Sequence, residues 1–149
     1  MIADLLRRFA GEPTPDPLDI DDARLALAAL MVRVARSDGT YSADERNRID
    51  RVLADHYRLA AAAAEALRAE AEAVEAQAPD TVRFTRLVKG AVPHEERSGV
   101  VEALWRVAAA DGIGADEHGL MRLVANLVGV ADQDSGLARQ RVLKDDAGS

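Results

Sequence analysis

Apolar residues recur along this chain at the spacing of α-helices, and the alternation typical of β-strands is absent. The stretch 20–37 carries Ala, Leu, Met and Val on every side after Leu25, which predicts a helix buried nearly all round. A second such helix is expected to end near Ala110, because the chain is apolar on most sides from Val100 onward. The pattern predicts an all-α fold, a compact bundle of about seven or eight helices.

The other helices are expected to be amphipathic or short. They are predicted over 42–57, 60–77 and 80–90, from Gly114 or Ala115, and from Asp132 or Asp134. The Ala- and Glu-rich helix over 60–77 is expected to lie outermost, because its apolar edge is narrow. Gly90 is expected to end the next helix with a positive φ, and the final helix is expected to be short. The helix from about 115 is expected to turn five residues inward: Leu120, Met121, Leu123, Val124 and Leu127.

Prolines interrupt the chain near its start. The segment 11–19 holds three of them, at positions 13, 15 and 17, and so cannot form a continuous helix. We therefore expect a short N-terminal helix and Pro-rich linker over 1–18, followed by one helical domain over 19–149.

Composition narrows the possible functions. The 149 residues carry a net charge of -7, which argues against nucleic acid as a partner. The chain has no cysteine, so disulfides, thiolate catalysis and cysteine-ligated metals are excluded. No stretch approaches the roughly 20 apolar residues of a membrane span, and the charged start of the chain does not resemble an export signal. We expect a cytoplasmic protein that reaches a membrane only through a partner protein or its first helix.

A unit consisting of a helix, an Asp-Gly turn and an acidic helix start occurs twice. Residues 31–39 match residues 104–112 at a constant offset of 73 residues. Asp44-Glu45 follows the first turn and Asp116-Glu117 follows the second, whose loop is shorter by one residue. The duplication covers the two most apolar helices and so indicates that the core is built from two related halves.

Each unit is similar to the second half of a calcium loop. The glycine permits a sharp turn, and Glu45 stands seven residues after Asp38, as the two-oxygen ligand of such a loop does. The upstream acidic ligands are missing, because Val34 and Arg36 occupy their places. One loop therefore has too few of the roughly six to eight oxygen ligands that Ca²⁺ requires, whereas two loops together can share an ion. Oxygen ligands favour Ca²⁺ or Mg²⁺ over zinc.

Helix capping explains several of these residues without an ion. Ser42 to Glu45 form a capping-box sequence, and Gly39 and Gly112 are suited to end helices. Asp38 and Asp111 are harder to explain in this way, because a carboxylate at a helix C-terminus opposes the helix dipole. The ion site and the capping interpretation both remain open at this point.

The duplication, with FTRL at 84–87 and EALWRVAAADG at 102–112, resembles the TerB-like superfamily, named for a tellurite resistance protein. The likeness spans about residues 20–143. The chain is also similar to the N-terminal region of the co-chaperone DjlA. The resemblance implies a helical bundle and a role in stress response or in membrane-associated complexes. It also implies a divalent-cation site near the turns, formed by four residues: Asp38, Glu45, Asp111 and Glu117. In the second copy Glu117 lies six residues after its Asp, and His118 holds the seventh place.

Three classes of function are compatible with this sequence. The first is a non-catalytic module of the tellurite-resistance type that binds Ca²⁺ or Mg²⁺ and serves as an adaptor for another protein. The second is a purely structural bundle that binds partners without a metal. The third is a metal-dependent hydrolase, which requires an open coordination position and a cleft. We favour the first, because the acidic turns are duplicated and the sequence shows no catalytic residues.

Overall fold

The computed structural model describes residues 20–37, 39–77, 81–109 and 115–147, and every regular element within these ranges is a helix. The elements are α2 (Ile20–Ala35), α3 (Ala43–Tyr57), α4 (Ala61–Gln77), α5 (Thr81–Ala91), the 3-10 turn η1 (His94–Glu96), α6 (Arg97–Ala108), α7 (Ala115–Val128) and α8 (Asp132–Ala147). The all-α prediction is confirmed. The helix and linker predicted over 1–18 lie outside the described residues.

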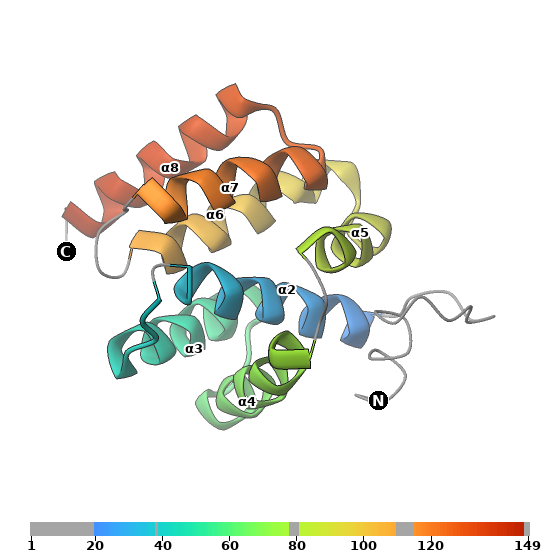
Figure 1. Ribbon diagram of the computed structural model, residues 1–149, viewed down its shortest axis with the longest axis vertical. Helices are drawn as coiled ribbons and strands as arrows, with labels where there is room; N and C mark the ends of the chain where they lie inside the picture. The colour runs from blue at the N-terminus through green and yellow to red at the C-terminus, as the bar shows by residue number, and fades with distance from the viewer. Residues whose placement is uncertain (1–19, 38, 78–80, 110–114, 148–149) are drawn as a thin grey trace.

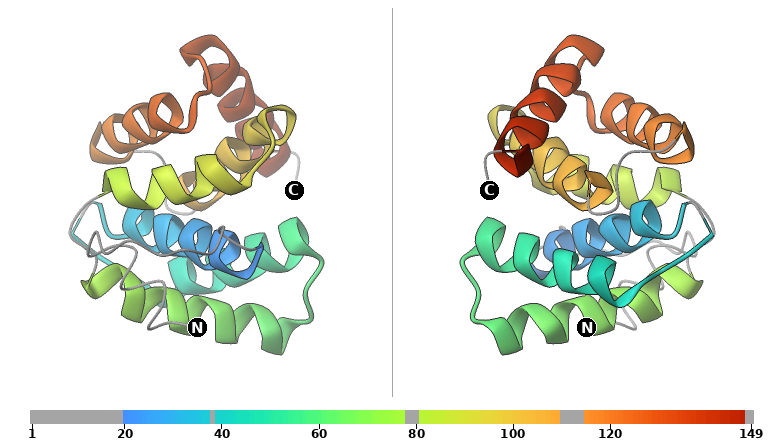
Figure 2. Two further views of the ribbon diagram at one scale, coloured as in Figure 1. Left: turned by 90° about the vertical axis from the view of Figure 1, so that its right-hand side faces the viewer. Right: turned by 90° about the vertical axis from the view of Figure 1, so that its left-hand side faces the viewer.

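Helix α2 lies at the centre of the bundle (Figure 1). It packs against α3 and α4 on one side and against α5, α6 and α7 on the other, while α8 packs on α6 and α7 (Figure 2). Every side chain of α2 from Leu25 to Val32 is at most 4% exposed, so the prediction of a helix buried nearly all round is confirmed. Alanines at three of these positions let the neighbouring helices approach closely.

Helix α5 ends later than the sequence predicted. Gly90 lies inside α5, and the positive-φ glycines among the described residues are Gly39 and Gly129. The helical bonding continues past Gly90, because the Val92 N–H donates to the Val88 carbonyl at 2.9 Å. Pro93 follows and lacks an N–H to donate, so the proline and not the glycine marks the end of this helix.

The inward face of α7 is narrower than predicted. Met121, Val124 and Val128 are fully buried at helical spacing, but Leu123 is 47% exposed. Leu123 was therefore wrongly predicted to point inward. In the sequence Leu123 falls between the buried positions Met121 and Val124, and the helical rotation from residue to residue turns its side chain toward the opposite face.

The last helix is also longer than predicted, since α8 has 16 residues. Its inner face consists of Ser135, Ala138 and Val142, all at most 6% exposed and packed toward α6. These small and polar residues give little apolar signal in the sequence. The turn before α8 is fixed by Gly129, which has φ 93°, and by the Val130 N–H, which donates to the Ala125 carbonyl at 2.8 Å.

Candidate functional site

The helices that flank the two repeated turns meet at one end of the molecule. The last turns of α2 and α6 point to the same end, and α3 and α7 start from it (Figures 1 and 2). The Arg48 Nε of α3 donates to the backbone carbonyl of Arg106 in α6 at 2.8 Å. This bond joins the first repeat to the second, one helical turn beyond Glu45 on α3. The fold therefore brings the flanks of both acidic turns together.

The first turn is closed by Gly39. Its φ of 87° lies in the left-handed region that favours glycine, and its N–H donates to the Arg36 carbonyl at 3.0 Å. Gly39 thus has the positive φ that suits a turn glycine, but α2 itself already ends at Ala35. Its counterpart Gly112 lies outside the described residues.

Glu45 forms the predicted capping box with Ser42. The Glu45 N–H donates to the Ser42 Oγ at 3.1 Å, and the Ser42 N–H donates to the Glu45 Oε1 at 2.9 Å. The glutamate is only 5% exposed. The cap therefore accounts for the position of Glu45 without an ion, and it also fixes a buried carboxylate beside the first turn.

The other three predicted ligands are not placed by the structure. Asp38 and Asp111 lie outside the described residues, and Glu117 lies in the first turn of α7 with its side chain undescribed. Among the side chains that are described, no group of three or more His, Asp or Glu could hold a metal ion. The four-residue ligand set therefore stays a prediction.

The equivalent arginines of the two repeats each pair with a carboxylate. Arg33 Nε lies 3.3 Å from Glu75 Oε1 of α4, and Arg106 Nη2 lies 2.9 Å from Asp55 Oδ2 of α3. The Arg33 guanidinium also lies over the Phe84 ring, 5.0 Å from its centroid. An arginine on an apolar helix can extend its charged end into solvent or pair with a carboxylate, and the structure shows pairing for both.

A polar network on α4 holds the loop after the first turn. The Tyr41 hydroxyl donates to Glu72 Oε2 at 2.6 Å, and Arg68 pairs with Asp50 at 2.6 Å and with Glu72 at 3.2 Å. Burial, followed by the hydrogen bond to Glu72, raises the pKa of Tyr41. The sequence analysis missed this network, because only the Arg68 and Glu72 pair has a local spacing that sequence could have shown.

Two helix, Asp-Gly turn, helix units that share one end of an all-α bundle define a TerB-like class of protein. The family model of the tellurite resistance protein TerB matches residues 24–140, and the chain belongs to this family. The resemblance inferred from sequence is thereby confirmed. No match was found among curated proteins or among solved structures. The likeness to DjlA stays a prediction.

Proposed function

We propose that this TerB-family protein is a non-catalytic stress-response module that binds a divalent cation between its two Asp-Gly turns and acts as an adaptor for another protein. The observation that supports this most directly is the approach of the two repeats at one end of the bundle, joined by Arg48 and the Arg106 carbonyl. The proposed ligands are Asp38, Glu45, Asp111 and Glu117, and the proposed ion is Ca²⁺ or Mg²⁺.

The carboxylates of this end suit a cation. The helix dipoles contribute little, because α2 and α6 end there with partial negative charge while α3 and α7 begin there with partial positive charge (Figure 1). Glu45 adds a buried carboxylate that its cap holds in place. A carboxylate fixed in this way loses little conformational freedom when an ion binds, which supports a role for Glu45 in the proposed site.

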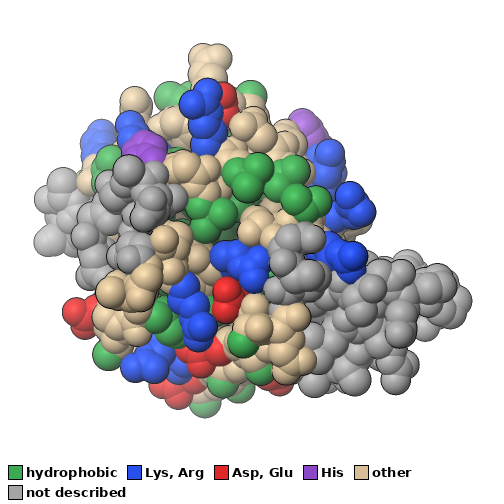
Figure 3. All heavy atoms as spheres, in the orientation of Figure 1, with side chains coloured by type: hydrophobic (Ala, Val, Ile, Leu, Met, Phe, Trp, Pro, Cys, Tyr) green, Lys and Arg blue, Asp and Glu red, His purple; other side chains and the backbone are tan. Residues whose placement is uncertain are grey.

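A bundle that binds a partner without a metal is the second candidate. The capping box favours it, because the cap explains Glu45 with no ion. Figure 3 shows hydrophobic side chains gathered on one face over α7 and toward α5, and Leu123 of α7 is 47% exposed. No helix in the described part of the chain is long and apolar enough to cross a membrane.

Calorimetric titration of the metal-free protein with Ca²⁺ and with Mg²⁺ tests the proposal. The wild type is compared with Asp38→Asn/Asp111→Asn and with Glu95→Gln/Asp134→Asn, a control that removes two exposed carboxylates outside the turns, in η1 and in the first turn of α8. We expect saturable binding in the wild type and in the control, and none in the turn variant. Ion at about 100 times its Kd should also stabilise the wild type by about 2.7 kcal/mol.

Circular dichroism establishes that each variant is folded before the comparison is made. No heat and no shift in melting temperature at millimolar Ca²⁺ or Mg²⁺ would contradict the ion site. Equal binding by the wild type and the turn variant would place any bound ion elsewhere, and it would equally overturn the proposal. In either case the metal-free bundle becomes the better description of the protein.

A further inference from the structure

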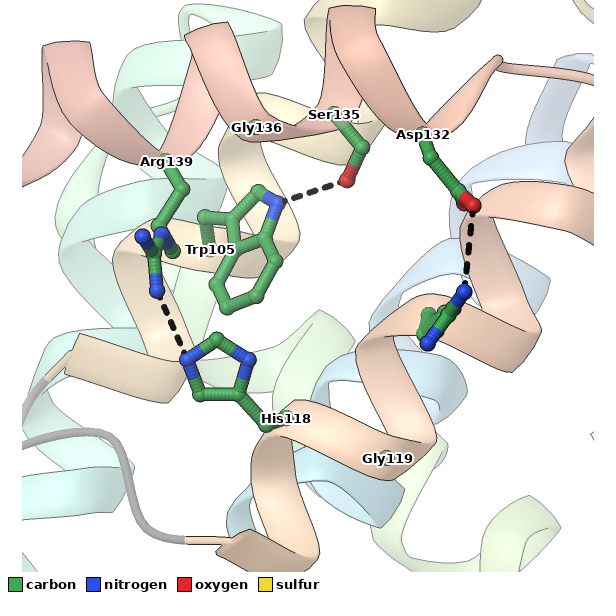
Figure 4. A pocket seen from close by; sticks show the side chains of 8 residues that line it. Trp105, His118, Gly119, Asp132, Ser135, Gly136 and Arg139 are labelled. Carbon is green, nitrogen blue, oxygen red and sulfur yellow. Dashed lines mark hydrogen bonds and ion pairs between the residues drawn. The ribbon is translucent and has the colours of Figure 1, made fainter.

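A pocket of about 380 Å³ lies between α6, α7 and α8 (Figure 4). Its volume is within the range of small-molecule sites, which is roughly 300 to 1,000 Å³. It is lined by Trp105, His118, Gly119, Arg122, Asp132, Ser135, Gly136 and Arg139. None of the four proposed ion ligands is among these residues.

The indole of Trp105 lies at the base of the pocket, with the His118 ring edge-on to it at 5.4 Å between centroids and the Arg139 guanidinium 6.0 Å from its centroid. Its Nε1 donates to the Oγ of Ser135 at 3.0 Å, and both residues are at most 6% exposed. The indole N–H is therefore satisfied within the protein, and the bond fixes the orientation of the ring (Figure 4). Gly119 and Gly136 leave the space beside it open, because a Cβ added at either glycine would meet nothing within 4 Å.

The polar groups of the pocket are mainly cationic. Arg139 Nη1 lies 2.8 Å from His118 Nε2, which must accept, because a guanidinium has no acceptor (Figure 4). Arg139 forms no ion pair with any carboxylate that the structure describes. Arg122 lies 3.5 Å from Asp132, and since both are more than half exposed this pair is weak. Two guanidinium groups and a single carboxylate, Asp132 beside Arg122, thus line the pocket of a protein whose net charge is -7.

We propose that this pocket binds a small aromatic carboxylate, with the acid group on Arg139 and the ring against the part of Trp105 that the pocket exposes. A planar guanidinium matches a carboxylate in two parallel hydrogen bonds, and an indole favours a flat ring beside it. The single negative charge of a carboxylate suits this site better than a phosphate dianion does, because Asp132 lines the same pocket and repels additional negative charge. This binding does not depend on the proposed ion site.

Fluorescence of Trp105 measures this binding directly, because it is the only tryptophan in the chain. We would titrate the protein with benzoate, with the uncharged analogue benzamide and with acetate, at constant ionic strength. We expect a saturable change with benzoate at an affinity at least about tenfold higher than for benzamide, since only benzoate pairs with Arg139. Acetate lacks the ring and should give no saturable change at the same concentrations.

Two pairs of variants test the geometry. Arg139→Gln should weaken benzoate binding by at least about tenfold, whereas Arg86→Gln, on the exposed side of α5, should leave it unchanged. Gly136→Leu should abolish binding by placing a side chain in the open space beside Trp105. Gly90→Leu is its control, because Gly90 also lies within a helix and faces open space.

Equal affinities for benzoate and benzamide would overturn the proposal, because the guanidinium would then contribute nothing. Unchanged benzoate binding in folded Arg139→Gln or in Gly136→Leu would overturn it as well. The absence of any saturable change in fluorescence with benzoate, together with an unmoved indole N–H resonance in the NMR spectrum, would have the same meaning. Arg139→Gln is compared only after its melting curve shows a folded protein. If Arg139→Gln is unfolded, benzoate binding by Gly136→Leu tests the proposal instead.

Discussion

Glu45 has a structural role that needs no ligand. Its carboxylate and the Ser42 hydroxyl each accept a backbone N–H at the start of α3, where the first N–H groups of a helix lack partners within the helix. The same carboxylate lies beside the turn where the proposed cation would bind. A loss of stability on changing Glu45 therefore cannot by itself distinguish capping from ion binding, whereas a change of Ser42 affects the cap alone.

Replacing Ser42 with Ala should lower the free energy of unfolding by about 1 kcal/mol, because the Glu45 N–H loses its acceptor. Urea denaturation of the metal-free protein measures this loss. Ser98→Ala is the matched control, since Ser98 is exposed within α6 and should tolerate the change. Equal stability of the two variants would show that the capping box contributes little to α3.

Helix α4 is held by ion pairs as well as by apolar packing. Only Ala64, Ala71 and Val74 are buried in it, in agreement with the narrow apolar edge expected from the sequence. The Arg68 side chain, only 18% exposed, connects it to Asp50 of α3. Such partly buried pairs matter most when one partner is removed, because the remaining charge is then left without compensation.

Arg68→Met keeps the apolar stem of the side chain and removes its charge. We expect a loss of about 2 kcal/mol in the free energy of unfolding, because the hydrogen bonds to Asp50 and Glu72 disappear together. The matched variant is Arg51→Met, at an exposed position on α3. Urea denaturation compares the two, and a loss no larger than that of Arg51→Met would rule out Arg68 as an anchor of α4.

The second repeat affects the protonation of His56, which lies in α3 of the first repeat. Burial lowers the pKa of His56 below its usual 6.5, and the positive charge of Arg106 from the second repeat lowers it further. The negative charge of Glu96 raises the pKa of His56, but its effect is smaller than that of burial or of Arg106. The packing of the two halves of the molecule thus favours an uncharged imidazole at the end of α3.

Folding should therefore become less favourable in mild acid. Between the lowered pKa of folded His56 and the value of 6.5 expected in the unfolded chain, the unfolded state binds more protons, so stability falls as the pH falls. We expect His56→Gln to lose less stability than the wild type between about pH 7.5 and about pH 5.5. His94→Gln, at an exposed position of η1, should behave like the wild type. Urea denaturation at both pH values decides this, and identical pH profiles for the wild type and His56→Gln would contradict it.

Features with a local signature were predictable from the sequence. The all-round burial of α2 and the cap between Ser42 and Glu45 depend on neighbouring residues and were predicted correctly. The hydrogen bond from Arg48 to the Arg106 carbonyl spans 58 positions, and that from Trp105 to Ser135 spans 30. Such contacts depend on how whole helices pack, and no local spacing reveals them. The candidate ion ligands rest on the repeat and the family resemblance alone.

The central place of α2 also affects how the protein is made. Among the helices that the structure describes, those that pack closely on α2 all follow it along the chain, and α7, the last of them, ends at Val128. During synthesis the apolar sides of α2 therefore leave the ribosome well before the second repeat exists to cover them. A nascent chain that has reached only α4 still lacks α5, α6 and α7, and the exposed surface favours aggregation or binding by chaperones. For this fold, the most vulnerable stage comes before the chain is complete.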